Sequence, residues 1–256
     1  MNAPTLLIGL GGTGCRIVER VSRLATPEQR DSIAYAVFDT DVNDLRGIKE
    51  RNPFIHTIQT STKQTVGEYI SKDIHASSKW FPMNKILNRK TMTEGAGQVR
   101  AVSRLAFEAA MRAGMLEPLH EAIQSLFKVE EDKPDQSVRV IIVSSLAGGT
   151  GSGLILPVGL YVRQYLDNHF HKSSSIFRGF FILPEVFYNV ISSMSERNNL
   201  KANAYATLRE LDAFLMKGDG TLTDKYKRTV ELEMPSGAGG AYEDYSKSPY
   251  DYCFLF

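Results

Sequence analysis

Three glycine-rich stretches hold the residues of this sequence that are best suited to chemistry. The richest of them, the third loop, follows the apolar run 138–144 almost without a gap. Glycine permits tight turns and close approach of the main chain to a ligand, and the free N–H groups at the start of a helix favour a phosphate. Four glycines within six residues cost conformational entropy that such an approach justifies. We therefore interpret as a phosphate loop the residues Ala147, Gly148, Gly149, Thr150, Gly151, Ser152 and Gly153.

The first loop lies near the start of the chain. Residues 9–14 match G-x-G-x-x-G between an apolar run and a helical pattern, which is the context of a dinucleotide-binding fingerprint. In a Rossmann domain an acid after the second strand binds the ribose, and Asp39 or Asp41 could serve. A P-loop does not fit, because Cys15-Arg16 stands where the phosphate lysine and the magnesium-binding hydroxyl belong. The first loop by itself leaves the kind of phosphate ligand open.

The elements that must position these loops follow from the hydrophobic pattern. Apolar runs without polar alternation predict buried parallel strands, and apolar residues at helical spacing predict helices. Strands are expected at 5–10, 33–38, 54–58, 138–144, 177–183 and 250–256, the last as a core strand. Helices are expected from Gly14 to about residue 24, at 98–127 with a bend at Pro118, at 154–165 and at 199–215, with a small hairpin at 229–240. The sum is an α/β domain with a doubly wound, mostly parallel, Rossmann-like sheet whose glycine loops gather at the carboxyl ends of the strands.

Composition bounds the class of protein. The 256 residues carry a formal net charge of +1, so no basic excess indicates a nucleic-acid or anionic-membrane partner. No apolar run approaches the roughly 20 residues of a membrane-spanning helix, and no basic, apolar leader opens the sequence. A secreted domain of this size would usually carry more cysteines than Cys15 and Cys253, which indicates the reducing cytoplasm.

The three loops together resemble those of the tubulin/FtsZ superfamily. The run 148–153 looks like the G-G-T-G-[ST]-G loop with which that family wraps the nucleotide phosphates. Its first phosphate loop is matched by Gly11, Gly12, Thr13, Gly14 and Cys15, and the stretch after its second strand by Asp39, Thr40 and Asp41, with Asp39 in place of the usual asparagine. The second loop, formed by Gly95, Ala96 and Gly97, resembles the loop that covers the terminal phosphate. The resemblance spans about residues 6–215 and is nearest to large, divergent bacterial tubulin-like proteins.

This resemblance implies a module that binds GTP or GDP, with Mg2+ bridging phosphate oxygens and no direct side-chain ligand to the metal. The sugar-binding loop should contain Pro184 and Glu185, with Glu196 and Asn199 as further candidates. The family's guanine-binding asparagine, central helix and catalytic acid would fall beyond Phe256. We expect residues 1–256 to be a single nucleotide-binding domain, the amino-terminal part of a longer GTPase that assembles with itself head to tail. Hydrolysis would need the remaining part and a neighbouring subunit.

Other interpretations stay open at this stage. An NAD(P)-dependent oxidoreductase would use the first loop and Asp39, and a tubulin-like scaffold would keep the fold for assembly without catalysis. Individual residues also have simpler roles: Asp39 and Asp41 as helix caps, and Cys15 as a small buried residue rather than a nucleophile. Arg100 and Arg104 either approach the phosphates or form surface ion pairs.

Overall fold

The computed structural model describes residues 4–72, 75, 79–82, 84–92, 97–127, 137–171, 173–218, 232–236 and 241–256. The strands are β1 (Thr5–Leu10), β2 (Ile33–Asp39), β3 (Ile55–Gln59), β4 (Ser137–Ser145), β5 (Ser174–Ile182), β6 (Leu232–Pro235), β7 (Tyr242–Tyr245) and β8 (Tyr252–Leu255). The helices are α1 (Gly11–Leu24), α2 (Pro27–Arg30), α3 (Val42–Arg51), α4 (Val66–Lys72), α6 (Lys85–Asn88), α7 (Arg100–Arg112), α8 (Glu117–Leu126), α9 (Gly149–His169) and α10 (Met194–Gly218), with the 3-10 turn η1 (Pro184–Phe187). Among these described helices, none combines the length and the apolar character needed to cross a membrane.

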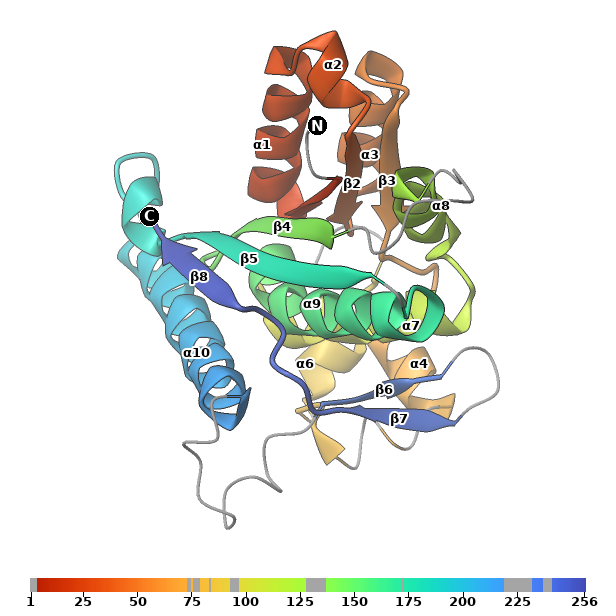
Figure 1. Cartoon of the computed structure of the whole chain (residues 1–256). Coiled ribbons are helices and arrows are strands. Elements are labelled where there is room, and N and C mark those ends of the chain that lie inside the picture. The colour runs from red at the N-terminus through yellow and green to blue at the C-terminus, as the bar shows by residue number, and fades with distance from the viewer. Residues whose placement is uncertain are drawn as a thin grey trace.

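A six-stranded sheet in the order β3-β2-β1-β4-β5-β8 forms the centre of the molecule (Figure 1). Every neighbouring pair in it is parallel. From β1 the order runs outward through β2 and β3, and from β4 it runs the other way through β5 and β8, so the sheet reverses between β1 and β4. Such a reversal is where doubly wound sheets bind their ligands. The expected fold class is confirmed, and β6 and β7 form the separate antiparallel hairpin.

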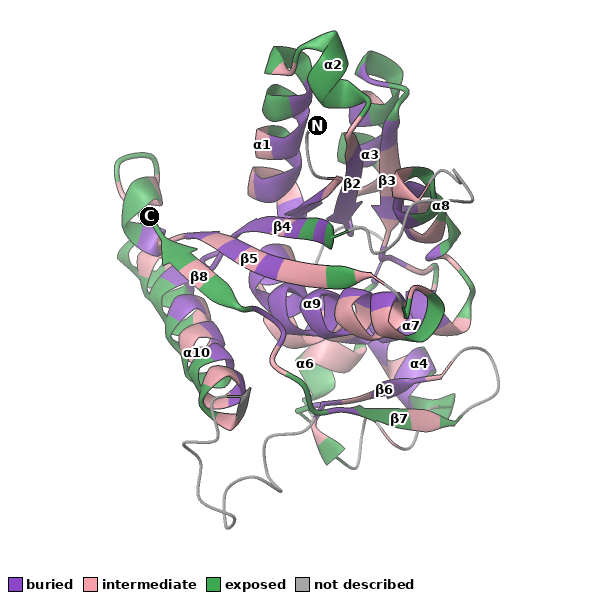
Figure 2. Ribbon diagram, viewed as in Figure 1, coloured by how far each residue is buried: buried purple, intermediate pink, exposed green. Residues whose placement is uncertain are grey.

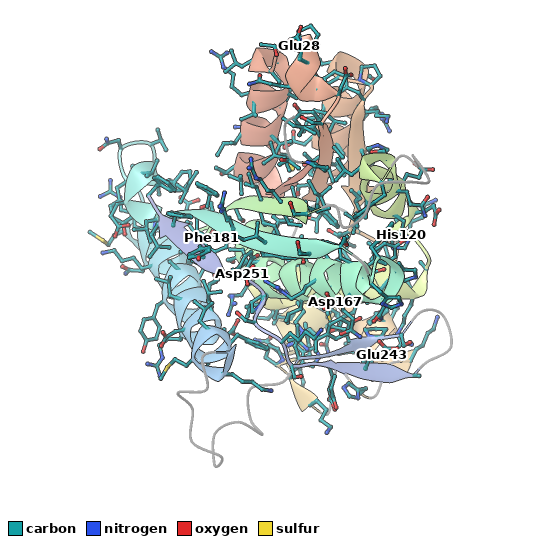
Figure 3. The ribbon with its side chains drawn as sticks, viewed as in Figure 1. Glu28, His120, Asp167, Phe181, Glu243 and Asp251 are labelled. Carbon is teal, nitrogen blue, oxygen red and sulfur yellow. The ribbon has the colours of Figure 1, made fainter. Side chains whose placement is uncertain are left out.

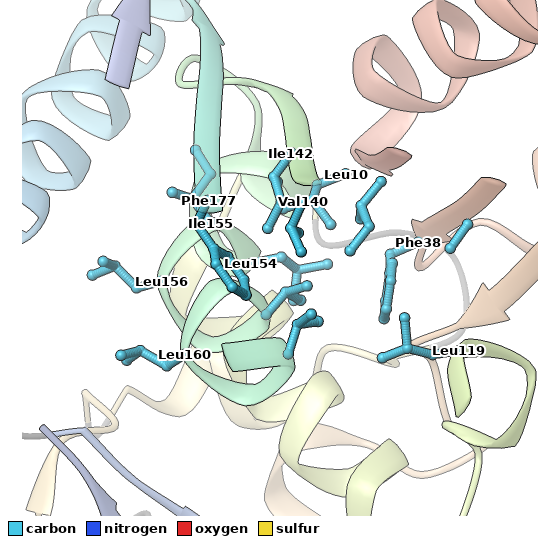
Figure 4. Packing of buried hydrophobic residues seen from close by; sticks show 14 of the residues in the cluster. Leu10, Phe38, Leu119, Val140, Ile142, Leu154, Ile155, Leu156, Leu160 and Phe177 are labelled. Atoms are coloured by element: carbon cyan, nitrogen blue, oxygen red, sulfur yellow. The ribbon is translucent and has the colours of Figure 1, made fainter. Parts of the chain in front are cut away.

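The larger part of the core lies between one face of this sheet and the helices α8, α9 and α10. Leu10, Phe38 and Ile142 are fully buried there, against Leu119 of α8 and Leu154 of α9 (Figure 4). In Figure 1, α9 and α10 lie below β4 and β5 in the view shown, while α1 lies above them. Side chains on alternate positions of the strands therefore belong to different cores.

The second core lies on the opposite face, under α1 and α3. Leu7, Tyr35 and Val37 point to this side, where they meet Val18 of α1 and Leu45 of α3. A strand that is covered on both faces gains free energy from apolar side chains at every position. This double coverage explains why the apolar runs of β1 and β2 show no polar alternation.

The α1 side of the sheet is less completely covered at β5 and β8. The ring of Phe180 stacks on those of Phe254 and Phe256, with centroids 4.9 and 6.0 Å apart. Even so, Phe254 is 42% and Phe256 61% exposed (Figure 2). Ile141 and Ile182 line a neighbouring apolar hollow of about 480 Å³. The strand predicted at 250–256 is present as β8, but it lies at the edge of the sheet with exposed aromatic rings, so its assignment to the core was wrong.

Several predicted helices also differ in their bounds from the observed ones. The long helix expected over 98–127 is divided into α7 and α8 by a turn in which Gly114 has φ +69°. Pro118 lies in the first turn of α8, where its missing N–H removes no helical hydrogen bond, so it starts a helix instead of bending one. α1 and α9 begin inside the glycine loops, at Gly11 and Gly149, several residues before the expected starts.

Asp251, the residue before β8, anchors the start of this strand to β5 and α9 (Figure 3). Its Oδ2 accepts the main-chain N–H of Phe177 in β5 at 2.6 Å and faces the guanidinium of Arg163 in α9 at 3.0 Å. The preceding residue, Tyr250, is fully buried and donates its hydroxyl to the carbonyl of Ile155 in α9 at 2.6 Å. These contacts attach the last strand to both the sheet and α9.

Candidate functional site

The first and third loops meet at the reversal of the sheet. β1 and β4 are paired with Leu10 opposite Ser144, so the two loops leave the sheet at the same level. The Ser144 hydroxyl donates to the Leu10 carbonyl at 3.2 Å. Gly11 has φ +68°, and a Cβ on it would lie 2.8 Å from the main-chain nitrogen of Gly151. The loops therefore touch main chain to main chain, which a side chain at Gly11 would prevent.

Helices that begin at the glycine loops have open N-termini. α1, α7 and α9 have 14, 13 and 21 residues, and among these described helices the N-cap residues Leu10, Val99 and Gly148 make no side-chain capping hydrogen bond. The first turns of these three helices contain no acid either. By contrast, Thr26 caps α2 and Asp41 caps α3. Free N–H groups and the helix dipole leave a partial positive charge at each open end, so this corner of the molecule suits an anion.

The described end of the second loop reaches the same corner. A Cβ on Gly149 would lie 2.7 Å from both Cα of Gln98 and the nitrogen of Val99, so the start of α7 lies against the start of α9. Gly97 has φ +50°, a conformation that favours glycine. The other two predicted residues of this loop, Gly95 and Ala96, lie outside the described residues.

Asp39 borders the first loop from the end of β2. Its Oδ1 accepts the N–H of Thr40 at 2.7 Å and that of Asp41 at 3.2 Å. Burial raises the pKa of the Asp39 carboxyl, and these two N–H donors offset part of that rise. A Cβ on Gly12 would lie 3.9 Å from Oδ2 of Asp39 and 4.0 Å from Oδ2 of Asp44. The carboxylates of two acids thus stand beside the first loop.

Asp41 and Thr40 form hydrogen bonds with α3 and α9, respectively. The Asp41 carboxylate accepts the main-chain N–H groups of Asn43 at 2.8 Å and of Asp44 at 3.3 Å, so it is the N-cap of α3. The hydroxyls of Thr40 and Thr150 lie 3.1 Å apart and share a hydrogen bond. This bond connects the end of β2 to the first turn of α9.

Cys15 is buried just after the first turn of α1. Its side chain is 1% exposed, and the thiol donates to the Phe38 carbonyl at 3.4 Å. Burial raises the pKa of the Cys15 thiol well above its ordinary value, and the acids at 39 and 44 act in the same direction. A protonated, buried thiol is a poor nucleophile, which agrees with the structural role considered for this residue.

Side chains of the third loop are directed largely into the loop itself. The buried Ser152 donates its hydroxyl to the Gly148 carbonyl, and the Ala147 N–H donates to the Ser145 hydroxyl at 3.1 Å. These bonds shape the loop while its main chain continues into α9. In the first loop, Thr13 is partly exposed within the first turn of α1.

The predicted sugar-binding residues follow β5 at the same edge of the sheet. Pro184 and Glu185 form the start of η1, with Pro184 buried and Glu185 exposed. Glu196 accepts a hydrogen bond from the Gln98 side-chain amide at 3.2 Å, which places it beside the second loop. Asn199 is exposed one helical turn further along α10.

Arg100 and Arg104 form ion pairs on the side of α7 that faces α10 and β6. Arg100 pairs with Glu210 through two bonds of 2.5 and 2.7 Å. Arg104 pairs with Glu108 at 3.1 Å and lies 3.8 Å above the centre of the Trp80 ring. In these positions both guanidinium groups support the packing of α7.

Sequence reasoning did not single out one residue that joins the second and third loops, Asn203. The side-chain amide of Asn203 in α10 donates to the carbonyls of Gln98 and Ala147, each at 3.0 Å. Asn203 is seven residues after Glu196, the spacing that repeats on one face of a helix. No local signal in the sequence connected Asn203 to carbonyls 105 and 56 positions away.

Fold and loop arrangement together define a protein of the tubulin/FtsZ type. The family model described as "Tubulin like" matches residues 6–256, and this chain belongs to that family. No curated protein matches the sequence.

A solved structure with a TM-score of 0.50 shares the fold of this chain. The GTPγS-form protofilament of TubZ from Bacillus thuringiensis serovar israelensis aligns with a TM-score of 0.50 and 13% identity, over 99% of this chain and 47% of that one. CetZ from Methanosaeta thermophila aligns with a TM-score of 0.44 and 18% identity, over 81% of this chain and 42% of that one. The chain thus spans less than half the length of these two structures.

Proposed function

We propose that this chain is a guanine-nucleotide-binding module that holds GTP or GDP by its phosphates at the three glycine loops. The observation that carries the proposal is the convergence of three uncapped helix N-termini, those of α1, α7 and α9, at the reversal of the sheet. An anion near one such terminus is typically stabilised by about 0.3–1 kcal/mol, and by up to about 2 kcal/mol when partly buried. Three termini acting on one polyphosphate would supply several kilocalories per mole.

The glycines support close contact between this main chain and a phosphate. A Cβ on Gly12 would meet no atom nearer than 3.9 Å, so the glycine there is not required by internal packing. The space that such a methyl group would take is left for a ligand. Thr13 and Thr150, both partly exposed in the first turns of α1 and α9, would offer hydroxyl donors to the phosphates.

Mg2+ belongs to the proposal as a bridge between phosphate oxygens. Asp39 and Asp44 bring negative charge beside the first loop, which would repel a bare polyphosphate and attract its metal complex. On this proposal the ion is held chiefly by the nucleotide. When bound, the ion would neutralise charge on the phosphates.

For the parent protein we propose GTP hydrolysis coupled to head-to-tail self-association. The TubZ structure similar to this chain is a protofilament in a GTPγS form, and it is about twice as long as the aligned part. On this proposal the 256 residues supply the phosphate-binding half of a site. The residues for base recognition and hydrolysis come from a following segment and a neighbouring subunit.

A comparison of ligands by thermal shift tests the proposal. GTP and GDP with Mg2+ should raise the unfolding temperature, while NAD(P) should leave it unchanged, and EDTA should weaken the effect of GTP. Gly12→Ala should lose the shift because its methyl group enters the ligand space. Gly47→Ala is the matched control, since on α3 the added methyl would meet only the flexible end of Arg51.

Each outcome decides between functions. Stabilisation by NAD(P) and by no guanine nucleotide would overturn the proposal in favour of an oxidoreductase domain. Absence of any nucleotide effect, together with sedimentation that does not respond to GTP, would overturn it in favour of a scaffold.

A further inference from the structure

A pocket of about 350 Å³ lies at the opposite end of α9 from the glycine loops. It is bounded by the turn between α7 and α8, the start of α8, the second half of α9 and the hairpin of β6 and β7. Its aromatic and acidic lining includes Glu117, His120, Tyr161, Tyr165, Glu243 and Tyr245. Because an α-helix rises about 1.5 Å per residue, Tyr161 lies roughly 18 Å along α9 from the first residue of that helix. The pocket is therefore a separate site from the phosphate corner.

Stacked rings form the side of the pocket that α8 and α9 contribute. The His120 ring lies parallel to that of Tyr165, with centroids 4.4 Å apart, and Tyr165 stacks in turn on His169 at 4.2 Å. The Tyr161 hydroxyl and Nε2 of His120 share a hydrogen bond of 2.8 Å. Rings that hold one another in this way give the pocket a preformed aromatic wall.

The inner part of the pocket is apolar. Met111, Leu116 and Tyr245 line it, and all three are buried. Burial, together with the nearby Glu243 carboxylate, raises the pKa of Tyr245 to about 12, so this phenol stays neutral. A ligand that fills the pocket must therefore present an apolar part to these side chains.

Two carboxylates at the same pocket have neutral or histidine partners. Glu243 accepts the Ser236 hydroxyl at 2.6 Å and the Gln164 amide at 3.1 Å. Glu117, whose side chain is 70% exposed, lies 3.5 Å from Nδ1 of His120. Within the described part of the chain, neither acid pairs with a lysine or an arginine, and neither basic type lines the pocket.

Both carboxylates act on one place in the pocket. Burial raises the pKa of the Tyr161 hydroxyl, and the charges of Glu117 and Glu243 add to that rise. A negative potential of this kind attracts a cation, and the negative faces of aromatic rings strengthen the attraction. The lining thus combines acceptors for a positive group with an apolar interior.

We propose that this pocket binds a small organic cation, a primary ammonium group on a short aromatic or aliphatic body. The ammonium group would lie beside Glu117 and Glu243, and the apolar body would lie against the buried Met111, Leu116 and Tyr245. Both acids are exposed, so solvent screens their attraction and the apolar contacts must supply a share of the affinity. No nucleotide takes part, so the site and the proposed function stand or fall separately.

Calorimetric titration with phenethylamine tests the site, with phenethyl alcohol as a neutral molecule of nearly the same shape. The amine should bind at least about tenfold more tightly than the alcohol, and its affinity should fall as the salt concentration rises. Glu243→Gln removes one charge from the pocket and should weaken amine binding by about three- to fivefold. Asp244→Asn is the matched control on the same strand, because neighbouring residues of a strand point to opposite faces. It removes the same charge and should leave the binding constant within about twofold.

Amide chemical shifts locate the bound amine in the native chain. Phenethylamine should shift the amides of the second half of α9 and of β7, and these shifts should be lost in the double variant Glu117→Gln/Glu243→Gln, whose fold is checked by circular dichroism. Absence of binding, equal affinity for the amine and the alcohol, or equal losses in Glu243→Gln and Asp244→Asn would overturn the proposal. Shifts confined to the glycine loops would also overturn it.

Discussion

The last glycine of the third loop should be a packing residue, and replacing it tests how α7 and α9 fit together. In Gly153→Ala the new Cβ would overlap the Arg100 carbonyl oxygen, and it would lie 2.9 Å from Cβ of Ser103 and 3.1 Å from the Arg100 carbonyl carbon. Main-chain atoms of α7 cannot rotate away as the end of a long side chain can, so the two helices must move apart.

The expected cost follows from two opposing terms. Overpacking of this kind costs about 1–3 kcal/mol, and overlap with main-chain atoms favours the upper end of that range. Alanine in a helix interior regains about 1 kcal/mol over glycine. We expect Gly153→Ala to lower the free energy of unfolding by about 2 kcal/mol.

Gly148→Ala is the matched control within the same loop. A Cβ at Gly148 would meet nothing within 4 Å, and the residue has φ −75° and ψ 164°, which alanine adopts readily. Its free energy of unfolding should stay within about 0.5 kcal/mol of the native value.

Urea unfolding followed by far-UV circular dichroism, and by the fluorescence of the single tryptophan, Trp80, measures both variants. Coincident transitions would justify a two-state treatment. A Gly153→Ala protein as stable as the native chain would refute the reasoning, because it would mean that α7 yields without cost.

Three further predictions concern other parts of the fold. Asp41→Ala should lower the free energy of unfolding by about 1 kcal/mol in urea titration through loss of the α3 cap, whereas Asp41→Asn should retain most of it; equal losses would contradict the capping role. Arg51 lowers the pKa of the Glu19 carboxyl, so this pair stabilises the fold fully above the ordinary carboxyl pKa of about 4.3 and loses its effect as pH falls through the lower folded value. Glu19→Gln should flatten that part of a stability–pH profile, and an unchanged slope would count against the pair. Phe256→Asp should reduce binding of a hydrophobic dye to the native chain, since Phe254 and Phe256 leave an apolar patch exposed; undiminished dye fluorescence would place the patch elsewhere.

Much of the sheet was predictable because its signals are local. The strands at 5–10 and 138–144 are apolar at nearly every position, and burial on both faces requires that pattern. The points at which helices end were harder to predict. The turn between α7 and α8 depends on Gly114, a single glycine within a helical pattern. The sequence prediction placed the bend at Pro118 instead, although Pro118 lies in the first turn of α8.

Whether β8 is a core strand or an edge strand could not be predicted from its residues. Tyr252, Phe254 and Phe256 have the composition of a core strand, yet the strand pairs on one side with β5 and exposes these rings. A strand's position in a sheet depends on what packs against it. The apolar pattern predicted that this strand would be covered but could not show that, among the described residues, its α1 side lies open.

The sequence by itself predicted a phosphate site at the glycine loops, because glycine content, strand ends and helix starts are properties of neighbouring residues. Only the tertiary structure decided how the loops are joined: Gly11 against Gly151, Thr40 beside Thr150, and Asn203 between Gln98 and Ala147. These contacts cross long distances in sequence, and each depends on helix packing and strand register that no local pattern specifies. The residues expected to bind phosphate are therefore part of the loops' own sequence, whereas the arrangement of the loops into one site depends on the sheet and on α10.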